Sequence, residues 1–285
     1  MEEELEHLQR LGKSLNEHFQ HVDEEMRLAA SLQRDFFPRS LELIGPLSIA
    51  SLNRPASWVS GDAYDVFRVD ERHVAFYVAD VVGHGVAAGL LTMFIKHAVI
   101  GKRVTGHSYE VLEPGETLQR LNDALRQHAL PKCQFVTAAY CLINTETLVM
   151  KYARGGHPYP ILIDREGRST ELKATGGLMG LFDPAHFATE QVQLHPGEKV
   201  VLYSDGLEAR FEANSSQSDP SRRGHRAVFE LLSRSGATEM IARLNELLDA
   251  RQRTDLPADD TTIVIAEVNH EDSSKTSPPP PSSVG

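Results

Sequence analysis

The sequence predicts an α+β protein with largely antiparallel β-structure, and three observations lead to this prediction. A long amphipathic helix opens the chain, short β-type runs punctuated by turn residues follow, and several of these runs are joined by very short links. Parallel strands need a connection of a dozen or more residues, whereas antiparallel strands can be joined by a tight turn. The 285 residues, 41% of them hydrophobic, are enough to bury a sizeable core.

The predicted N-terminal helix carries one apolar stripe and ends near Pro38, because proline disfavours a helical residue before it. The stripe is built from apolar residues at steps of three or four: Leu8, Leu11, Leu15, Phe19, Val22, Met26, Ala29 and Leu32. Two partners for this stripe remain open. It can pack on its own domain, or it can form a short coiled-coil seam between two copies of the chain. We assign residues 1–40 to this amphipathic helix, with a possible dimerising or regulatory role.

The rest of the chain predicts a single domain over residues 41–268. The region 47–83 is expected to form two strands around a turn, and a polar serine-rich loop is expected over 213–224. Helices are predicted over 86–100, 117–129 and about 226–251, and further strands over 135–143, 148–153, 159–163, 199–203 and 261–268. Residues 269–285 are rich in Ser and Pro and have too little apolar surface to order themselves, so we expect a disordered tail.

Composition argues against several classes of function. The formal net charge is −11 and the pI is about 5.6, so the chain lacks the basic footprint of a nucleic-acid binder and is poorly suited to an anionic membrane surface. No stretch of eighteen consecutive apolar residues occurs, and the N-terminus is acidic where a signal peptide is basic. We therefore expect a cytoplasmic protein, with Cys133 and Cys141 as packing thiols.

Aspartates recur where predicted strands meet turns. The four segments are Ser60-Gly61-Asp62, Ala79-Asp80-Val81-Val82-Gly83-His84-Gly85, Tyr203-Ser204-Asp205-Gly206 and Ala258-Asp259-Asp260-Thr261-Thr262. Any one of them alone is explained by the preference of aspartate for turns. Strand-end aspartates from different strands can nevertheless converge on one side of a sheet. Such a patch of negative charge would repel itself unless cations occupied it.

Oxygen ligands without histidine or cysteine favour a hard cation, Mg²⁺ or Mn²⁺, over zinc. Two such ions about 4 Å apart suit phosphoryl transfer, because together they orient the nucleophile and stabilise charge on the phosphate oxygens. The chain has no Gly-x-x-x-x-Gly-Lys-Ser/Thr loop and no His-Arg-Asp catalytic loop. Phosphatase chemistry is therefore favoured over kinase chemistry.

Together with further segments, these motifs resemble the SpoIIE/RsbU-type branch of the PPM metal-dependent serine/threonine protein phosphatases, from about Leu32 to Val268. The additional segments that carry the resemblance are Gln33 to Pro38, Pro55-Ala56, Ala63-Tyr64-Asp65, Gly155-Gly156-His157-Pro158 and Gly177-Leu178-Met179-Gly180. Their order is the order of the family. After Asp205-Gly206 the chain departs from the Phe-Gly pattern common in relatives, so the substrate-facing flap is expected to differ.

The resemblance implies two packed, mainly antiparallel sheets flanked by helices, with two Mn²⁺ or Mg²⁺ ions at one end. It implies that Asp80 bridges the ions, that the backbone carbonyl of Val81 completes one site, and that Asp205 and Asp259 ligate the other ion. Asp62 would contribute directly or through water. A water or hydroxide held by the metal would attack phosphoserine or phosphothreonine without a covalent enzyme intermediate.

Some neighbouring residues receive a structural interpretation. Asp260 should point to the other face because side chains alternate along a strand, so we favour Asp259 as the ligand, although the sequence leaves the choice open. His157 is interpreted as the rigid part of a turn, without chemistry. Arg54 is a weak candidate for a phosphate clamp.

The resemblance also suggests a partner and a mode of regulation. The implied substrate is a phosphorylated protein, an anti-sigma factor antagonist, in bacterial stress signalling. We hypothesise that pairing or rotation of the N-terminal helix moves the segment that carries Asp62 and so changes metal occupancy. The alternatives are a non-catalytic scaffold that keeps the phosphatase fold to bind a partner, and a metalloenzyme that acts on small phosphates.

Overall fold

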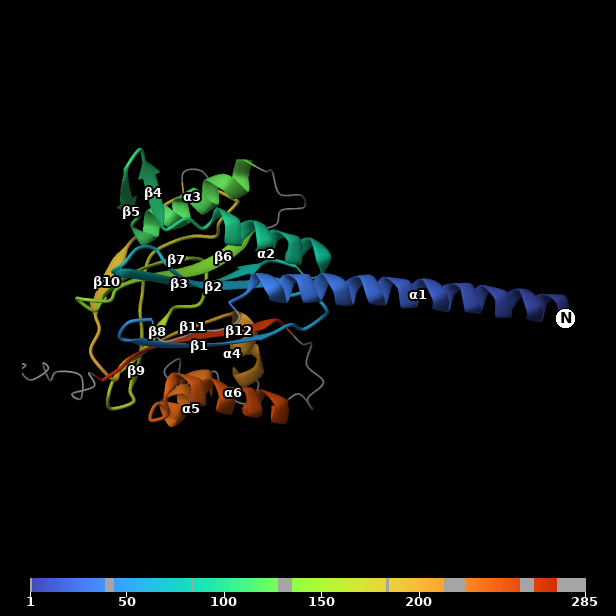
Figure 1. Ribbon diagram of the computed structural model, residues 1–285. Coiled ribbons are helices and arrows are strands. Elements are labelled where there is room, and N and C mark those ends of the chain that lie inside the picture. The colour runs from blue at the N-terminus through green and yellow to red at the C-terminus, as the bar shows by residue number, and fades with distance from the viewer. Residues whose placement is uncertain are drawn as a thin grey trace, which may run out of the picture.

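The computed structural model shows two β-sheets packed face to face, with helices on both outer faces and one long helix projecting from the domain (Figure 1). The structure describes residues 2–38, 44–83, 85–127, 135–182, 185–212, 224–251 and 259–270. The predicted α+β class with two packed antiparallel sheets is confirmed. In the described parts of the chain, no helix has the length and apolar character needed to cross a membrane.

The first five-stranded sheet, called here the β3 sheet, has the order β10-β7-β6-β3-β2. Its strands are β2 (Asp62–Arg68), β3 (His73–Val81), β6 (Val136–Asn144), β7 (Val149–Gly155) and β10 (Glu190–Gln193). Every pairing in it is antiparallel. Strand β3, which lies between β2 and β6, alternates buried side chains toward the helices and toward the second sheet, which explains why its sequence is apolar almost throughout.

The second sheet, called here the β12 sheet, has the order β1-β12-β11-β8-β9 and is also antiparallel throughout. Its strands are β1 (Leu47–Arg54), β8 (Ile161–Ile163), β9 (Ser169–Glu171), β11 (Lys199–Tyr203) and β12 (Thr261–Val268). The N-terminal strand β1 pairs along its whole length with the C-terminal strand β12. The two ends of the domain are thereby held together in one sheet.

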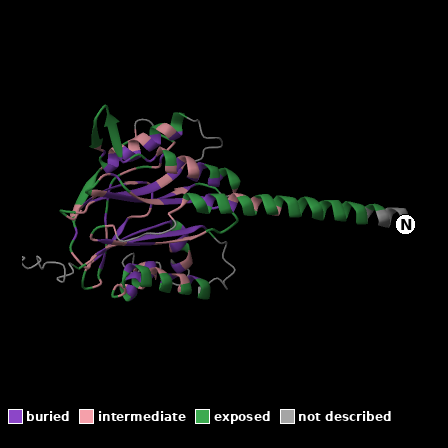
Figure 2. Cartoon of the chain, viewed as in Figure 1, coloured by how far each residue is buried: buried purple, intermediate pink, exposed green. Residues whose placement is uncertain are grey.

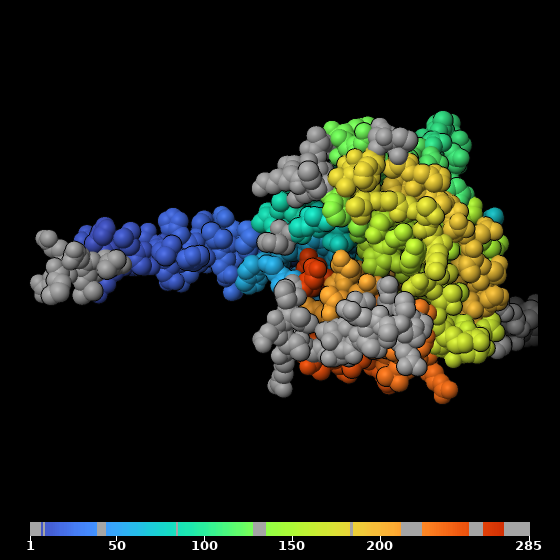
Figure 3. All heavy atoms as spheres, turned by 180° about the vertical axis from the view of Figure 1, so that it is seen from behind, coloured from blue at the N-terminus to red at the C-terminus, as the bar shows by residue number. Residues whose placement is uncertain are grey.

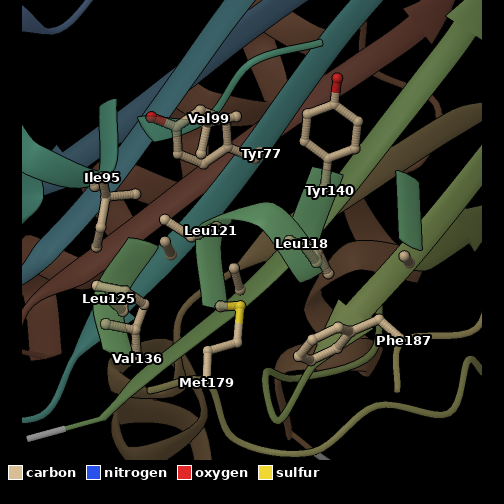
Figure 4. Close-up of a cluster of buried hydrophobic side chains, with 14 of the residues drawn as sticks. Tyr77, Ile95, Val99, Leu118, Leu121, Leu125, Val136, Tyr140, Met179 and Phe187 are labelled. Carbon is tan, nitrogen blue, oxygen red and sulfur yellow. The ribbon is translucent and has the colours of Figure 1, made fainter. Parts of the chain in front are cut away.

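Three apolar clusters hold the layers together. One lies between the β3 sheet and the helices α2 (Val86–Ala98) and α3 (Pro114–Gln127), where Tyr77, Ile95 and Leu121 meet (Figure 4). A second fills the space between the sheets and contains Phe76 and Val264. The third packs the β12 sheet against α4 (Asp205–Glu212), α5 (Gly224–Leu232) and α6 (Ala237–Arg251). These clusters hold the strands in place, and with them the residues at the strand ends.

The long helix α1 (Glu2–Phe36) stands away from the domain and touches it only near its C-terminal end (Figures 1 and 2). Much of the predicted apolar stripe is exposed, with 59% of Leu15 and 65% of Phe19 open to solvent. Near the domain, Ala30 and Gln33 of the same helix are buried. Of the stripe itself, Met26 and Ala29 are partly buried near the domain, whereas Leu32 is 50% exposed. The coiled-coil seam between two copies of the chain stays a prediction.

Some elements differ from the prediction. Residues 47–83 form three strands rather than two, because β2 and β3 pair with each other while β1 joins the other sheet. The helical region 226–251 is split into α5 and α6. A small hairpin, β4 (Lys102–Thr105) with β5 (Ser108–Val111), was not predicted, since its strands are exposed and carry no apolar run.

The remaining predictions concern the two cysteines, the serine-rich loop and the C-terminal tail. Cys141 is a buried free thiol in the cluster between the sheets, and burial raises its pKa, which fits a packing role. Cys133, nearly all of the serine-rich loop and most of the predicted tail lie outside the described residues.

Candidate active site

Aspartates from both sheets lie at the same end of the domain. Asp62 is the first residue of β2 and is paired in register with Asp80 near the end of β3. Asp205 follows β11 and opens α4, and Asp259 lies just before β12. Strand β12 contacts both β2 and β3 across the interface between the sheets. The fold therefore gathers the four aspartates that the sequence singled out.

Glycines beside two of these aspartates allow the backbone segments to approach closely. A Cβ atom on Gly61 would lie 3.1 Å from the carbonyl oxygens of both Val81 and Gly83. A Cβ atom on Gly206 would lie 2.0 Å from the carbonyl oxygen of Asp260, which is a collision. The glycines in Ser60-Gly61-Asp62 and Asp205-Gly206 are thus required by the packing of the site, not by a positive φ angle.

Asp62 is the most deeply buried of the four, with 1% of its surface exposed. The Ser204 hydroxyl donates to its Oδ2 atom at 2.7 Å, and Thr262 also hydrogen-bonds to its carboxylate. Burial and then the nearby charge of Asp80 raise its pKa well above the ordinary range, while these two hydrogen bonds act in the opposite direction. Without a compensating cation, this carboxyl group favours its neutral form.

The pKa values of Asp80 and Asp205 are also raised by burial and by neighbouring carboxylates. Burial raises the pKa of Asp80 to about 7, with further contributions from Asp205, Asp259 and Asp260. Burial and the charge of Asp259 raise the pKa of Asp205, against a hydrogen bond from the backbone of Gly206. Carboxylates that raise one another's pKa in this way form a single electrostatic unit, and a bound cation would relieve the repulsion.

Neighbouring Asp259 and Asp260 have different surroundings. The Asp260 carboxylate is buried and accepts hydrogen bonds of 2.6 Å from the backbone N–H groups of Ala56 and Gly61. Asp259 is exposed, and its charge acts on Asp80 and Asp205. Asp260 therefore fastens the turn that leads to Asp62, and Asp259 retains the environment expected of a ligand.

The four aspartates offer carboxylate oxygens, which suit a hard cation. The Val81 carbonyl lies in the same corner, against Gly61. In the described part of the chain, no three His, Cys, Asp or Glu side chains are already grouped closely enough to hold a metal ion. The carboxylates would have to turn toward one point to share a cation.

Several functional neighbours were missed in the sequence. Ser204 and Thr262 hold Asp62, and the available signal was that Ser204 precedes Asp205 and Thr262 lies two residues after Asp260. Arg210 of α4 donates to Thr261 Oγ1 at 3.2 Å and to the Asp259 carbonyl at 3.4 Å, which places a cationic side chain at the edge of the cluster.

Arg54 and His157 both make contacts that explain their positions structurally. Arg54 is bound to α6, with its Nη2 atom 2.7 Å from Asp249 and its Nη1 atom 3.2 Å from the Asn245 carbonyl. His157 is buried beside Thr137, and burial lowers its pKa to about 3, so its ring is neutral at physiological pH. Neither contact pattern indicates a direct chemical role.

The fold and this cluster define a PPM-type serine/threonine phosphatase. The PP2C domain of SiaA from Pseudomonas aeruginosa superposes with a TM-score of 0.72 and 19% identity, covering 88% of this chain and 98% of that one. The phosphatase domain of SpoIIE from Bacillus subtilis, solved with a fragment of its regulatory domain, superposes with a TM-score of 0.63 and 17% identity, covering 78% and 63%. The family described as Stage II sporulation protein E (SpoIIE) matches residues 70–269, and the chain belongs to this family.

Two curated relatives from Bacillus subtilis (strain 168) match the chain over part of their own length. Phosphoserine phosphatase RsbU is 27% identical over 247 residues, covering 86% of this chain and 71% of RsbU. Phosphoserine phosphatase RsbP is 26% identical over 186 residues, covering 64% of this chain and 45% of RsbP. The chain thus spans less than half the length of RsbP.

Proposed function

We propose that this chain is a cytoplasmic phosphatase that removes phosphate from phosphoserine or phosphothreonine on a protein, namely an anti-sigma factor antagonist, using two Mn²⁺ or Mg²⁺ ions. The observation that carries the proposal is the cluster of four strand-end aspartates from both sheets, in which burial and neighbouring carboxylates raise the pKa values of Asp62, Asp80 and Asp205. The relatives RsbU and RsbP, both phosphoserine phosphatases, support the substrate class.

In this proposal, Asp80 bridges the two ions and the Val81 carbonyl completes one site. Asp205 and Asp259 bind the other ion, and Asp62 contributes directly or through water. Bound cations supply positive charge for the phosphate oxygens and activate water at neutral pH. The chain itself orients the groups around the reaction: Ser204 and Thr262 hold Asp62, and Asp260 fixes the turn before it.

Activity is tested by phosphate release from a phosphoserine protein with Mn²⁺, with Mg²⁺ and with a chelator. Metal-dependent release is expected from the wild-type chain, and Asp80→Ala should abolish it. Glu166→Gln, an exposed change on the β8–β9 turn, serves as the matched control. No metal-dependent release from any phosphoprotein would favour the non-catalytic scaffold.

Helix α1 is the proposed regulatory element, and its contacts support a route to Asp62. The side-chain amide of Gln33 donates to the Ser60 carbonyl at 2.7 Å, and its Oε1 atom accepts from the Ser60 N–H at 2.9 Å. The same amide donates to Thr92 of α2 at 2.9 Å. Since the Ser60 hydroxyl accepts from the Asp62 N–H, a movement of α1 would reach the β2 end of the cluster.

The exposed stripe on the outer part of α1 supports a homodimer in which two α1 helices pair. Its members are Leu11, Leu15, Phe19 and Val22, which are at least half exposed within one chain. Helix α1, blue in Figure 3, projects from the domain. Deleting residues 1–30 should convert a dimer to a monomer and change metal-dependent activity. A monomer before and after the deletion, with unchanged activity, would overturn this part of the proposal.

A further inference from the structure

The polar side chains behind Asp62 belong to strands of both sheets. Strands β1 and β12 pair in one sheet, and β2, which begins at Asp62, lies in the other (Figure 1). Asn53 of β1 and Thr262 of β12 are register partners. Because side chains alternate along a strand, they lie on the same strand faces as Ile49 and Val264, which fill the space between the sheets. At the end of the domain that carries the aspartates, this row of side chains changes from apolar to polar.

The Ser204 hydroxyl is directed toward Asp62 as a donor. The backbone N–H of Thr262, which can only donate, reaches Ser204 Oγ at 2.9 Å. The single hydroxyl proton is then available to Asp62 Oδ2 at 2.7 Å, whereas the Asp260 carbonyl, at 3.4 Å, is the more distant acceptor. Ser204 and Asp62 are both buried, so bulk water does not compete for this bond.

Thr262 repeats this arrangement with its own hydroxyl group. The side-chain amide of Asn53 donates from Nδ2 to Thr262 Oγ1 at 2.8 Å. The Thr262 hydroxyl is in turn hydrogen-bonded to the Asp62 carboxylate. Because an amide NH₂ group only donates, the hydroxyl oxygen serves Asn53 as an acceptor and its one proton is available to Asp62. Thr262 is fully buried, so this proton needs a partner within the protein.

We propose that Asn53 is a positioning residue, which acts through Thr262 to hold the Asp62 carboxylate as a hydrogen-bond acceptor in the orientation that cation binding needs. The inference rests on the proposed function and extends the proposed cation site to a further strand, β1. Asn53 itself contacts neither a cation nor the substrate. It sets the polarity of the hydrogen bond between Thr262 and Asp62, and the contacts Asn53–Thr262–Asp62 are called here the relay.

A plainer role for Asn53 is to join β1 to β12, and the two roles predict different behaviour. The backbone ladder already pairs β1 with β12 along the whole of β1. If the Asn53 amide only added one more bond to this pair, its loss would lower stability and leave cation binding unchanged. If the relay operates, the chemical nature of the group at position 53 must change cation binding.

Asn53→Asp tests the polarity directly, because it keeps the size of the side chain and replaces a donating amide with an accepting carboxylate. The Thr262 hydroxyl proton is then drawn to position 53, and Asp62 loses a donor. Calorimetric titration of the full chain with Mn²⁺ should show one of the two ions bound about tenfold more weakly than in the wild type. An added negative charge by itself would strengthen cation binding, so unchanged or tighter binding would overturn the inference.

Asn269→Asp is the matched control for the added charge. Asn269 follows the opposite end of the β1–β12 pair, and its Oδ1 atom accepts a hydrogen bond of 2.8 Å from the Ser48 hydroxyl. A carboxylate accepts the same bond, so this variant adds the same charge without reversing a hydrogen bond. It should bind Mn²⁺ as the wild type does. Equal weakening in Asn269→Asp and Asn53→Asp would contradict the relay.

A double-mutant cycle assigns the effect to the Thr262 hydroxyl. Thr262→Val removes this hydroxyl at nearly constant shape, and in that background Asn53→Asp should no longer change Mn²⁺ affinity. Thr262→Ser keeps the hydroxyl and should retain the tenfold effect. The same loss on Asn53→Asp in both backgrounds would contradict the relay.

A milder variant keeps the test decisive if Asn53→Asp does not fold, which circular dichroism determines. Asn53→Ala removes the amide without reversing the bond, so it should weaken the binding of the same ion by a smaller factor. Wild-type affinity for both ions in Asn53→Ala, together with wild-type affinity in Thr262→Val, would overturn the inference.

The titration separates failure of this inference from failure of the proposed function. Two ions bound by the wild type, and bound with the same affinity by Asn53→Asp, would remove Asn53 from the site and leave the phosphatase assignment intact. No Mn²⁺ binding to the wild type, together with no metal-dependent phosphate release, would overturn both.

Discussion

The apolar clusters bury side chains that avoid water, whereas the aspartate cluster gathers carboxylates that repel one another, although the same strands contribute to both. Along β3, Phe76 and Val78 are completely buried among apolar side chains, whereas Asp80, a residue on the same strand, has its pKa raised by burial and like charge. The apolar clusters supply the stability of the domain, and the aspartate cluster reduces it. Such a local conflict between charge and burial is characteristic of a functional site.

The largest expected effect is on activity. Asp80→Asn removes the proposed bridging carboxylate while keeping the shape of the side chain, and we expect phosphate release with Mn²⁺ to fall on the order of a thousandfold, equivalent to several kcal/mol. The fold should remain intact, as judged by circular dichroism. Activity within about tenfold of wild type would show that Asp80 is not the central ligand.

A change in an apolar cluster should give the opposite result. Leu121 is completely buried between α3 and the β3 sheet, and Leu121→Ala is expected to lower the free energy of unfolding by about 3 kcal/mol. The metal dependence of the remaining activity should not change. Chemical denaturation and a Mn²⁺ titration of activity measure the two quantities; a shifted Mn²⁺ midpoint would mean that the two regions are energetically coupled.

Two adjacent residues, Asp260 and Asp259, are expected to differ in the same way: one supports the fold and the other is a proposed ligand. Asp260→Ala leaves the N–H groups of Ala56 and Gly61 without their acceptor and should cost about 2 kcal/mol of stability. Asp259→Ala removes an exposed carboxylate and should change stability by no more than about 0.5 kcal/mol. Equal losses in urea denaturation would refute the division of roles between these two residues.

A further small effect concerns the metal-free protein and the pH dependence of its stability. Between the ordinary aspartate pKa and about 7, folded Asp80 binds more protons than the unfolded chain does, so stability falls as pH rises through this range. In chelator at pH 8, Asp80→Asn should therefore be more stable than wild type by roughly 1 kcal/mol. Thermal melts from pH 5 to pH 8 measure this; a variant less stable than wild type at every pH would contradict the repulsion.

Much of the fold followed from the sequence, for identifiable reasons. Strands buried on both faces, such as β3 and β12, have long apolar runs, and helices with a single apolar face, such as α3, have clear periodicity. The hairpin β4–β5 and the short edge strands β9 and β10 carry no such pattern. Their pairing depends on neighbours distant in sequence, which local propensity does not encode.

The candidate site was predictable in part. The four aspartates were marked by their place at strand ends, two of them beside glycine, and the structure gathers them at one end of the sandwich. The hydrogen bonds from Ser204 and Thr262 to Asp62 could not be predicted, because they connect residues of the two facing sheets. The same holds for the link from Gln33 to Ser60, whose partners meet only when α1 docks on the domain.

The central claim is that carboxylates from both sheets form one site for two cations, and calorimetric titration with Mn²⁺ tests it most directly. Two ions per chain are expected to bind to the wild-type protein. Asp80→Asn should lose both, and Asp259→Asn should lose one, with Glu166→Gln unchanged. Two ions bound with undiminished affinity by the Asp80→Asn variant would contradict the account.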